Sequence, residues 1–387
     1  MKKIVISTLL IFLCFIIGFS SSINFVYAET ENYTAKALYL IDYNTGEVLF
    51  EKNPNEKMPV ASIVKLMTIL LTLENIQAEK LSLEETVIVS ENAAGMGGSQ
   101  VFLEAGGEYK VCDLLKSVIV SSANDASVAL AEKISGNTSN FVNLMNKRAS
   151  ELGLANTHYS NPTGLPAPEQ FSTAKDVAIL LKEVTKHDVY HKLSTIWIDK
   201  ILHSNNRETE LVNTNKLIRY YNGCDGGKTG STSEAGYCLA ATVKRGDMRL
   251  ISVVLGANSG KLRFGESSKL LNYGFDNFFN KQIVFSNNEI ENKLTVKQGK
   301  VDKIKTMPQE DIFLLCRKNS TDKIELSYEF VENIEAPVNE GDIVGKIYVM
   351  KNGEVVKEGN IVSKTTVFRR NYIDNINKAI DNWKIAG

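Results

Sequence analysis

The stretch ALYLIDYNTGEVLF (residues 37–50) decides the fold of the first part of this chain. Two runs of apolar, strand-forming residues flank the turn sequence Asn-Thr-Gly, a pattern typical of a β-hairpin. Strand character returns at residues 236–244 and 248–257, which the turn sequence Arg-Gly-Asp joins. The sequence therefore predicts antiparallel strands at both ends of a long segment.

Between and after these strands, apolar spacing predicts helices. Residues 62–76 are apolar at helical intervals and contain no helix breaker, so Ser62 is expected in the first helical turn. Further helices are expected at 112–120, 126–135, 141–152, 173–185 and 263–279, the last with Leu270, Leu271, Phe275 and Phe278 on one face. These patterns predict an α/β protein of the α+β type, with helices packed on an antiparallel sheet and an inserted helical subdomain.

Beyond residue 281 the sequence changes to short alternating apolar segments separated by turns. These segments are 283–285, 293–296, 312–316, 324–328, 343–350 and 354–356, and they predict a small all-β domain. The final stretch, 369–385, places Ile373, Ile376, Ile380 and Trp383 on one helical face with basic residues outside it. Taken alone, this pattern fits a helix lying on a membrane surface and a helix docked on the β-domain equally well.

The N-terminus has the three parts of a secretory signal. Lys2 and Lys3 precede an apolar run from Ile4 to Gly18, and a small-x-Ala sequence ends at Ala28, where we expect cleavage. The alternative is an uncleaved membrane anchor, since the apolar run borders on spanning length. Either alternative predicts that the remainder of the chain acts outside the cytoplasmic membrane.

Charge and the numbers of cysteine and histidine residues argue against several classes of function. The formal net charge is -1, or -3 once the two signal lysines are subtracted, which does not suggest a nucleic-acid partner. Four cysteines follow the signal, and although Cys224 and Cys238 could pair, buried thiols are the favoured interpretation. His187 and His191 lack the glutamate of a zinc-binding HExxH motif, so we expect neither a metal nor a cofactor.

Three short motifs carry the chemistry, in the order Ser62-Ile63-Val64-Lys65, Ser122-Ala123-Asn124 and Lys228-Thr229-Gly230. The first two patterns recur by chance elsewhere, for example SxxK at 172–175 and SxN at 204–206. Only the ordered set is specific, and such a set is typical of β-lactamases and penicillin-binding proteins.

The first motif can supply a nucleophile and its base. A serine hydroxyl needs an adjacent base, and residues three apart in a helix share a face, so Ser62 and Lys65 are expected within hydrogen-bond reach. Burial beside a second cation, for which Lys228 is the candidate, would depress the pKa of the Lys65 ammonium enough for it to act as a neutral base. Alone, Ser62 would be interpreted as a helix cap and Lys65 as a surface lysine.

The other two motifs can supply proton transfer and substrate binding. Ser122 is expected to relay a proton to the leaving amine, and the Asn124 amide to hold a substrate peptide group. Gly230 would let a substrate backbone approach, while Lys228 and the Thr229 hydroxyl would bind a carboxylate. The backbone N–H groups of Ser62 and Ser231 could form an oxyanion hole. A helix cap and a glycine-rich turn are the plainer interpretations of these motifs in isolation.

The chain resembles the low-molecular-mass penicillin-binding proteins, the D-alanyl-D-alanine carboxypeptidases of serine peptidase family S11, and especially their sporulation-associated branch. The resemblance begins near Tyr33, extends to the C-terminus and rests on five stretches: PVASIVKLM (59–67), SSANDA (121–126), NPTGL (161–165), DGGKTG (225–230) and EAGY (234–237). It implies a penicillin-binding/β-lactamase-like transpeptidase fold. It divides the chain into a signal peptide (1–28), a catalytic domain (29–280), an all-β domain (281–366) and an amphipathic membrane-associating helix (367–387).

The resemblance also implies an activity and a location. The activity is removal of the terminal D-alanine from peptidoglycan pentapeptides through an acyl-enzyme on Ser62, which β-lactams such as penicillin would also acylate. Arg263 looks like the arginine that helps to hold the substrate carboxylate in this family. The protein would act on the outer face of the cytoplasmic membrane in cell-wall biogenesis, with its C-terminal helix on the membrane surface. Two departures from the family pattern, Ala123 inside SxN and Ser231 after KTG, affect the expected substrate preference.

Two other functions compete with this one, and the sequence argues against each. A class A β-lactamase needs a glutamate three residues before a Leu-Asn pair, but Ser268 stands three residues before Leu271-Asn272. A non-catalytic wall-binding homologue would be expected to lack one of the catalytic residues, but the sequence retains all of them: Ser62, Lys65, Ser122 and Lys228.

Overall fold

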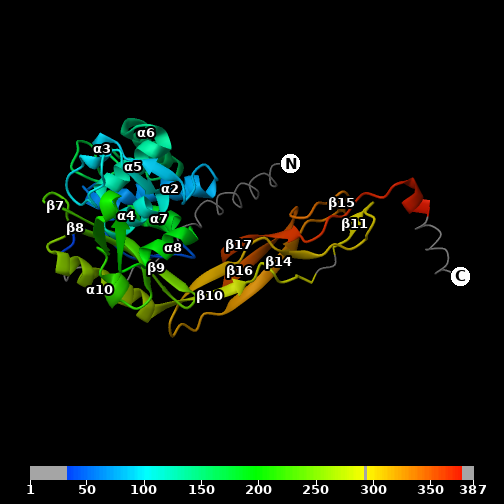
Figure 1. Cartoon of the computed structure of the whole chain (residues 1–387). Helices are drawn as coiled ribbons and strands as arrows, with labels where there is room; N and C mark the ends of the chain where they lie inside the picture. Colours follow the sequence, from blue (N-terminus) through cyan, green and yellow to red (C-terminus); the bar gives the residue numbers. More distant parts are fainter. Residues whose placement is uncertain (1–32, 292–293, 377–387) are drawn as a thin grey trace, which may run out of the picture.

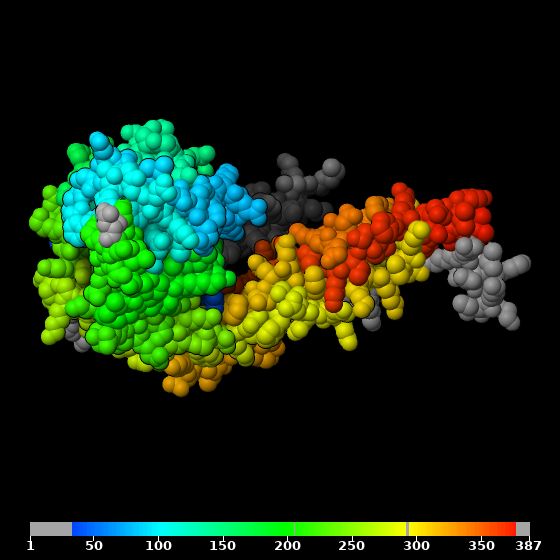
Figure 2. Space-filling model, in the orientation of Figure 1, coloured from blue at the N-terminus to red at the C-terminus, as the bar shows by residue number. Residues whose placement is uncertain are grey.

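The computed structural model describes residues 33–291 and 294–376. The expected signal peptide, at 1–28, lies outside the described residues, as do residues 377–387 of the expected C-terminal helix. The described chain forms a body of sheet and helices from which a narrow β-domain extends to one side (Figures 1 and 2).

The body is built on one antiparallel five-stranded sheet with the order β2-β1-β9-β8-β7. Its strands are β1 (Ala37–Asp42), β2 (Val48–Lys52), β7 (Cys224–Thr232), β8 (Gly236–Arg245) and β9 (Met248–Ala257). The two predicted hairpins are therefore present, and β1 joins them by pairing with β9. The strand β7, which carries the Lys-Thr-Gly motif, lies at one edge of the sheet.

Both faces of the sheet are covered, so all six residues of β1 are buried. Alternate side chains enter separate cores, with Tyr39 and Ile41 on one face and Leu38 and Leu40 on the other. The first face packs against α7 (Ala174–Val184), on which α2 (Lys65–Gln77) packs in turn, and the second packs against α10 (Gly260–Asn277).

The helical subdomain matches the predicted helices in order and approximate length. The predicted helices are α4 (Val111–Val120), α5 (Asn124–Ser135), α6 (Thr138–Glu151) and α7. Three short helices were not predicted: α3 (Glu91–Ala94), α8 (Asp188–Ser194) and α9 (Leu217–Tyr220), the last of which leads into the edge strand. Two small two-stranded sheets were not predicted, β3 (Thr86–Ile88) with β4 (Glu108–Lys110) and β5 (Ile198–Leu202) with β6 (Glu208–Val212). Their strands have only three to five residues, too few to establish a clear alternating pattern.

The predicted bounds of α10 were wrong at both ends. The helix begins at Gly260 because the hydroxyl of Ser259 caps it, accepting a 3.1 Å hydrogen bond from the backbone N–H of Leu262. It ends at Asn277, and Phe278 begins β10, where it pairs with Arg317. Phe278 therefore belongs to a strand and not to the apolar face of the helix.

The C-terminal part is an all-β arrangement around its own core. Its strands are β10 (Phe278–Val284), β11 (Val296–Lys297), β12 (Thr306–Pro308), β13 (Ile312–Arg317), β14 (Ile324–Phe330), β15 (Ile334–Glu335), β16 (Ile343–Lys351) and β17 (Glu354–Ser363). Asn280 joins this part to the body through a 2.5 Å hydrogen bond to the Asp42 carboxylate. Among the described residues, no helix is long and apolar enough to cross a membrane.

Candidate active site

Ser62 lies in a short 3-10 turn (Ala61–Val64) directly before α2, one turn earlier than the regular helix. The NPTGL loop packs against this turn so closely that a Cβ on Gly164 would lie 2.1 Å from the Ala61 carbonyl oxygen. Gly164 also has a φ of +79°, so glycine meets both the steric and the backbone requirement there. The loop and the turn together fix the backbone that carries Ser62.

Lys65 is completely buried and lies at the centre of the site. Its Nζ lies 3.2 Å from Ser62 Oγ and donates to Asn124 Oδ1 at 2.6 Å and to the Thr163 carbonyl at 2.5 Å. Burial, followed by repulsion from Lys228, holds the pKa of the Lys65 ammonium well below its usual range, although the Asp125 charge opposes this shift. The arrangement therefore favours a neutral amine beside the serine hydroxyl.

Asn124 is the first residue of α5 and is also buried. Besides accepting from Lys65, its side chain donates through Nδ2 to the Gly97 carbonyl at 2.7 Å. Its backbone N–H donates to the Ser99 carbonyl at 2.7 Å. Asn124 thus joins Lys65 to the loop after α3.

Ser122 lies in the connection between α4 and α5, as the sequence predicts, and is buried. Its φ is +62°, a conformation that is uncommon for a residue with a side chain and that is concentrated at functional sites. Within residues 33–291 and 294–376, no hydrogen bond from its hydroxyl to Lys65 or Lys228 is present. The structure therefore places Ser122 on the site's connecting loop without showing a formed proton relay.

The Lys-Thr-Gly motif lies against the Ser62 turn. A Cβ on Gly230 would approach the Val60 carbonyl oxygen to 2.6 Å and the Ser62 backbone nitrogen to 3.1 Å, so the close approach requires glycine. Thr229 is buried and Ser231 is exposed. Lys228 is 1% exposed, and its burial, followed by repulsion from Arg263, lowers its pKa to about 7.

Arg263 reaches the same strand from α10. Its Nη1 donates to the Gly230 carbonyl at 3.0 Å and to the Cys238 carbonyl at 3.4 Å. The guanidinium lies over the rings of Phe264 and Tyr237, with its Cζ atom 4.9 and 5.6 Å from their centroids. Burial lowers the pKa of the guanidinium. Arg263 therefore contributes positive charge behind the motif and also supports its backbone.

Three residues at the site were assigned no role from the sequence. Thr163 accepts from Lys65 through its backbone, and Asn161 Oδ1 holds that loop by accepting from the backbone N–H groups of Thr163 and Gly164 at 3.1 and 2.7 Å. Asp125 is fully buried and accepts from the backbone N–H groups of Val101 and Leu103 at 3.0 and 3.1 Å. The sequence indicated these residues only as members of the NPTGL and SSANDA stretches. Thr163 acts through its backbone, and Asn161 and Asp125 act by holding backbone N–H groups of loops, so no side-chain pattern marks them.

The described residues contain no group of three or more histidine, cysteine or acidic side chains that could hold a metal ion. Cys224 and Cys238 are buried free thiols, so the disulfide alternative is not realised in this structure.

Comparison with known proteins identifies the family. Residues 24–259 match the family profile for D-alanyl-D-alanine carboxypeptidase, peptidase S11, and residues 279–369 match the profile for the penicillin-binding protein 5 C-terminal domain. The chain is 39% identical to D-alanyl-D-alanine carboxypeptidase DacF of Bacillus subtilis over 90% of both chains. It is 36% identical to DacC of Escherichia coli, over 86% of this chain and 84% of that one.

A solved structure supports the same family assignment. The crystal structure of penicillin-binding protein 5 from Haemophilus influenzae superposes with a TM-score of 0.75 at 34% identity, covering 87% of this chain and 98% of that one. The likeness includes the antiparallel sheet with its helices and the C-terminal β-domain. The chain belongs to the peptidase S11 family of serine D-alanyl-D-alanine carboxypeptidases.

Proposed function

We propose that this chain removes the terminal D-alanine from peptidoglycan pentapeptides through an acyl-enzyme on Ser62. The observation that carries the proposal is the 3.2 Å contact between Ser62 Oγ and Nζ of Lys65, a fully buried lysine with a strongly lowered pKa. A neutral amine at hydrogen-bond distance is the base that a serine nucleophile requires.

In acylation, Lys65 takes the Ser62 hydroxyl proton as Oγ attacks the carbonyl carbon of the fourth residue. The backbone N–H groups of Ser62 and Ser231 stabilise the resulting oxyanion. The proton passes from Lys65 through Ser122 to the leaving amine, the peptide C–N bond breaks, and D-alanine departs. This role for Ser122 requires its hydroxyl to turn toward the lysines when substrate is bound.

Substrate binding uses the two edges of the site. Asn124 holds a peptide group of the substrate, and Gly230 leaves room for its backbone beside β7. The terminal carboxylate binds near Lys228 and the Thr229 hydroxyl, in the positive field to which Arg263 contributes. The low exposure of Lys228 supports this assignment because a buried ammonium gains most from an arriving anion.

Deacylation reverses these roles with water. Lys65 accepts a proton from a water molecule that attacks the ester carbon, and Ser62 recovers the proton when the ester C–O bond breaks. β-Lactams acylate the same oxygen. Because Ser268 stands where a class A β-lactamase would need glutamate, we expect this adduct to be long-lived and not to be hydrolysed rapidly.

We further propose secretion through the N-terminal signal and attachment of the C-terminal helix to the outer surface of the membrane. The helical turn at residues 372–376 supports the second point, because Tyr372 and Ile373 are 79% and 66% exposed. The site would then act on newly made wall near the membrane, in wall remodelling that includes sporulation.

Mass spectrometry tests the proposed chemistry. The processed protein should gain one penicillin on the peptide that contains Ser62 and should release D-alanine from a diacyl-Lys-D-Ala-D-Ala peptide. The Ser62→Ala variant should do neither. Rapid turnover of penicillin would favour the β-lactamase, and the absence of both reactions in folded protein would favour a binding homologue.

A further inference from the structure

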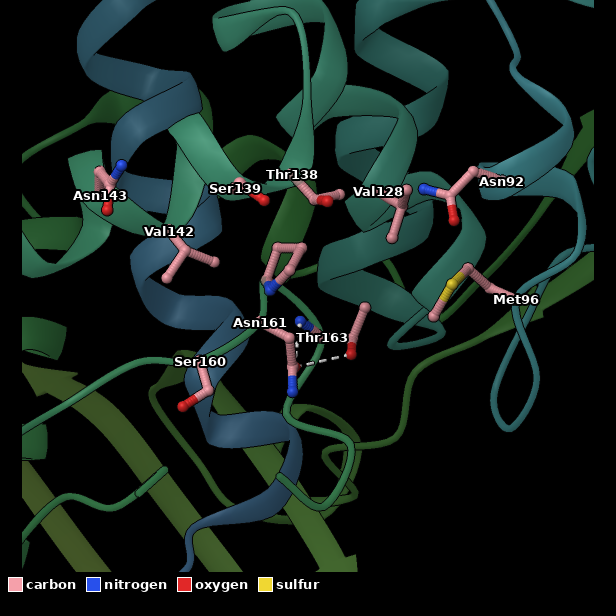
Figure 3. Close-up of a pocket in the computed structure, with 11 residues that line it drawn as sticks. Asn92, Met96, Val128, Thr138, Ser139, Val142, Asn143, Ser160, Asn161 and Thr163 are labelled. Carbon is pink, nitrogen blue, oxygen red and sulfur yellow. Dashed lines mark hydrogen bonds between the residues drawn. The ribbon is translucent and has the colours of Figure 1, made fainter. Parts of the chain in front are cut away.

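A cavity of about 370 Å³ lies beside the active site within the helical subdomain. Side chains from α5, α6, the segment around α3 and the loop at 160–163 surround it (Figure 3). Its volume lies within the range of roughly 300–1,000 Å³ that is typical of small-molecule sites. The acyl-transfer steps proposed above do not use this space.

Two walls of the cavity belong to segments that hold the catalytic groups. Thr163 lines the cavity and accepts the 2.5 Å hydrogen bond from Lys65. On another wall, Met96 precedes Gly97, whose carbonyl accepts from Asn124 at 2.7 Å. A molecule that fills the cavity would therefore contact both segments that position the Lys65–Asn124 pair.

The lining is uncharged and combines polar and apolar surface in similar amounts. None of the eleven described residues that form it carries a formal charge. Asn143 and Ser139 present an amide and a hydroxyl from α6, and within the described part of the chain neither side chain has a hydrogen-bond partner. Val128 and Val142 add apolar surface. The cavity thus offers amide and hydroxyl partners together with a small apolar surface.

We infer that this cavity binds an N-acetylated sugar unit of the glycan that carries the stem peptide. An acetamido group brings an amide and a methyl group, and the sugar ring brings hydroxyls, which match such a lining. A carboxylate-bearing peptide would require a cation, which the lining lacks. The inference rests on the proposed function because it names the part of the same substrate that lies outside the scissile bond.

The distance is compatible with one substrate filling both places. In a pentapeptide cleaved before its last residue, four residues separate the sugar from the reacting carbonyl, and four extended residues span at most about 14 Å. Thr163 touches Lys65 and lines the cavity, so the cavity begins one residue away from the catalytic amine. Binding energy gained there can position the peptide at Ser62.

The test compares two substrates on the full processed protein. One is a free pentapeptide, and the other is the same pentapeptide attached to an N-acetylated disaccharide. We expect kcat/KM for D-alanine release to be roughly tenfold higher with the disaccharide, which is the size of effect that one or two added hydrogen bonds supply. Ser139→Trp, which obstructs the cavity, and Asn143→Leu, which removes the amide, should bring the ratio of the two values close to one.

Lys147→Trp on the same helix is the matched control, since Lys147 does not line the cavity and its side chain is 73% exposed. It should keep the wild-type ratio. Penicillin labelling and free-peptide cleavage should remain unchanged in all three variants, which shows that they are folded.

A ratio of one in the wild type, or a ratio that Ser139→Trp and Asn143→Leu both leave intact, would overturn the assignment. The sugar assignment would also be overturned if a pentapeptide extended by neutral amino acids showed the same increase in kcat/KM as the disaccharide substrate. In that case the occupant of the cavity would be a peptide. If free pentapeptide were not cleaved at all, the proposed function would fail instead.

Discussion

Lys65 and Lys228 are two buried amines with no carboxylate in salt-bridge contact within the described structure. Burial is the main reason that both have lowered pKa values, and a neighbouring cation adds to the shift in each case. The two lysines nevertheless have different tasks in the proposed mechanism. Lys65 must be neutral to accept a proton, whereas Lys228 must be charged to attract a carboxylate.

This difference predicts a bell-shaped pH profile of kcat/KM for the D-Ala-D-Ala peptide. Raising the pH first removes the proton from Lys65 and increases the rate. A further increase removes the proton from Lys228, whose pKa is about 7, and weakens carboxylate binding. In Lys228→Arg the alkaline limb should move up by at least about one pH unit, because arginine stays protonated. An unchanged alkaline limb in this variant would assign that limb to another group.

Asn124 offers a second test of the lysine base. The amide oxygen of Asn124 lies 2.6 Å from Lys65 Nζ, and Asn124→Asp would place a carboxylate oxygen at about the same position. A carboxylate at that distance raises a lysine pKa by roughly 1–3 units, so the acid limb of penicillin acylation should shift to higher pH. Asn124→Ala is the uncharged control and should lower the rate roughly tenfold without that shift. Equal acid limbs in both variants would contradict the assignment of Lys65 as the base.

At the scale of elements, the NPTGL loop is expected to control the geometry of the serine turn. Gly164→Ala would introduce a Cβ 2.1 Å from the Ala61 carbonyl oxygen and should slow penicillin acylation more than tenfold, as well as lowering the melting temperature. Gly153→Ala is a matched control, because Gly153 also has a positive φ, +70°, but no atom lies within 4 Å of the place that a Cβ would occupy there. It should destabilise by about 1–2 kcal/mol and leave acylation unchanged. Equal acylation rates in the two variants would exclude the loop from this role.

The edge strand has its own positioning contact. The hydroxyl of Tyr190, on α8, accepts a 2.7 Å hydrogen bond from the backbone N–H of Gly227, next to the register shift in β7 and one residue before Lys228. Tyr190→Phe leaves that buried N–H unsatisfied and should destabilise the protein by about 1–3 kcal/mol. If Tyr190 positions Lys228, KM for the carboxylate-bearing peptide should rise more than kcat falls. A change in stability without any change in KM would show a purely structural role.

Elements with strong local signals were predictable, whereas those set by tertiary contacts were not. The hairpin at 37–50 and helix α5 follow from residue periodicity, and β1 and α5 are found where the sequence predicts them. The end of α10 was missed because Phe278 continues the helical apolar spacing while strand pairing with Arg317 takes it into β10. At the site, Ser62 and Lys65 meet through local spacing, but the Thr163 carbonyl reaches Lys65 from 98 residues away and through its backbone. No side-chain pattern encodes that contact.

At the scale of the whole molecule, the β-domain extends away from the catalytic body (Figure 1). The last described residues, 372–376, lie at the far end of this domain. If the proposed C-terminal membrane attachment is present, the β-domain separates the active site from the membrane surface. The distance between the active site and the membrane would then depend on the length of this domain and on the contact between Asn280 and Asp42.

This arrangement predicts that membrane binding and catalysis can be separated by truncation. The cut should follow Asn371 and not Thr366, because Val367 is 1% exposed within the β-domain core and pairs with Val338. The processed protein should sediment with vesicles that contain anionic lipid, and the truncated protein should stay in solution, because it lacks the apolar helical face. Both should label equally with penicillin. A milder variant, Ile373→Glu, should weaken sedimentation without removing any chain, and sedimentation of the truncated protein at the wild-type level would place the membrane contact elsewhere.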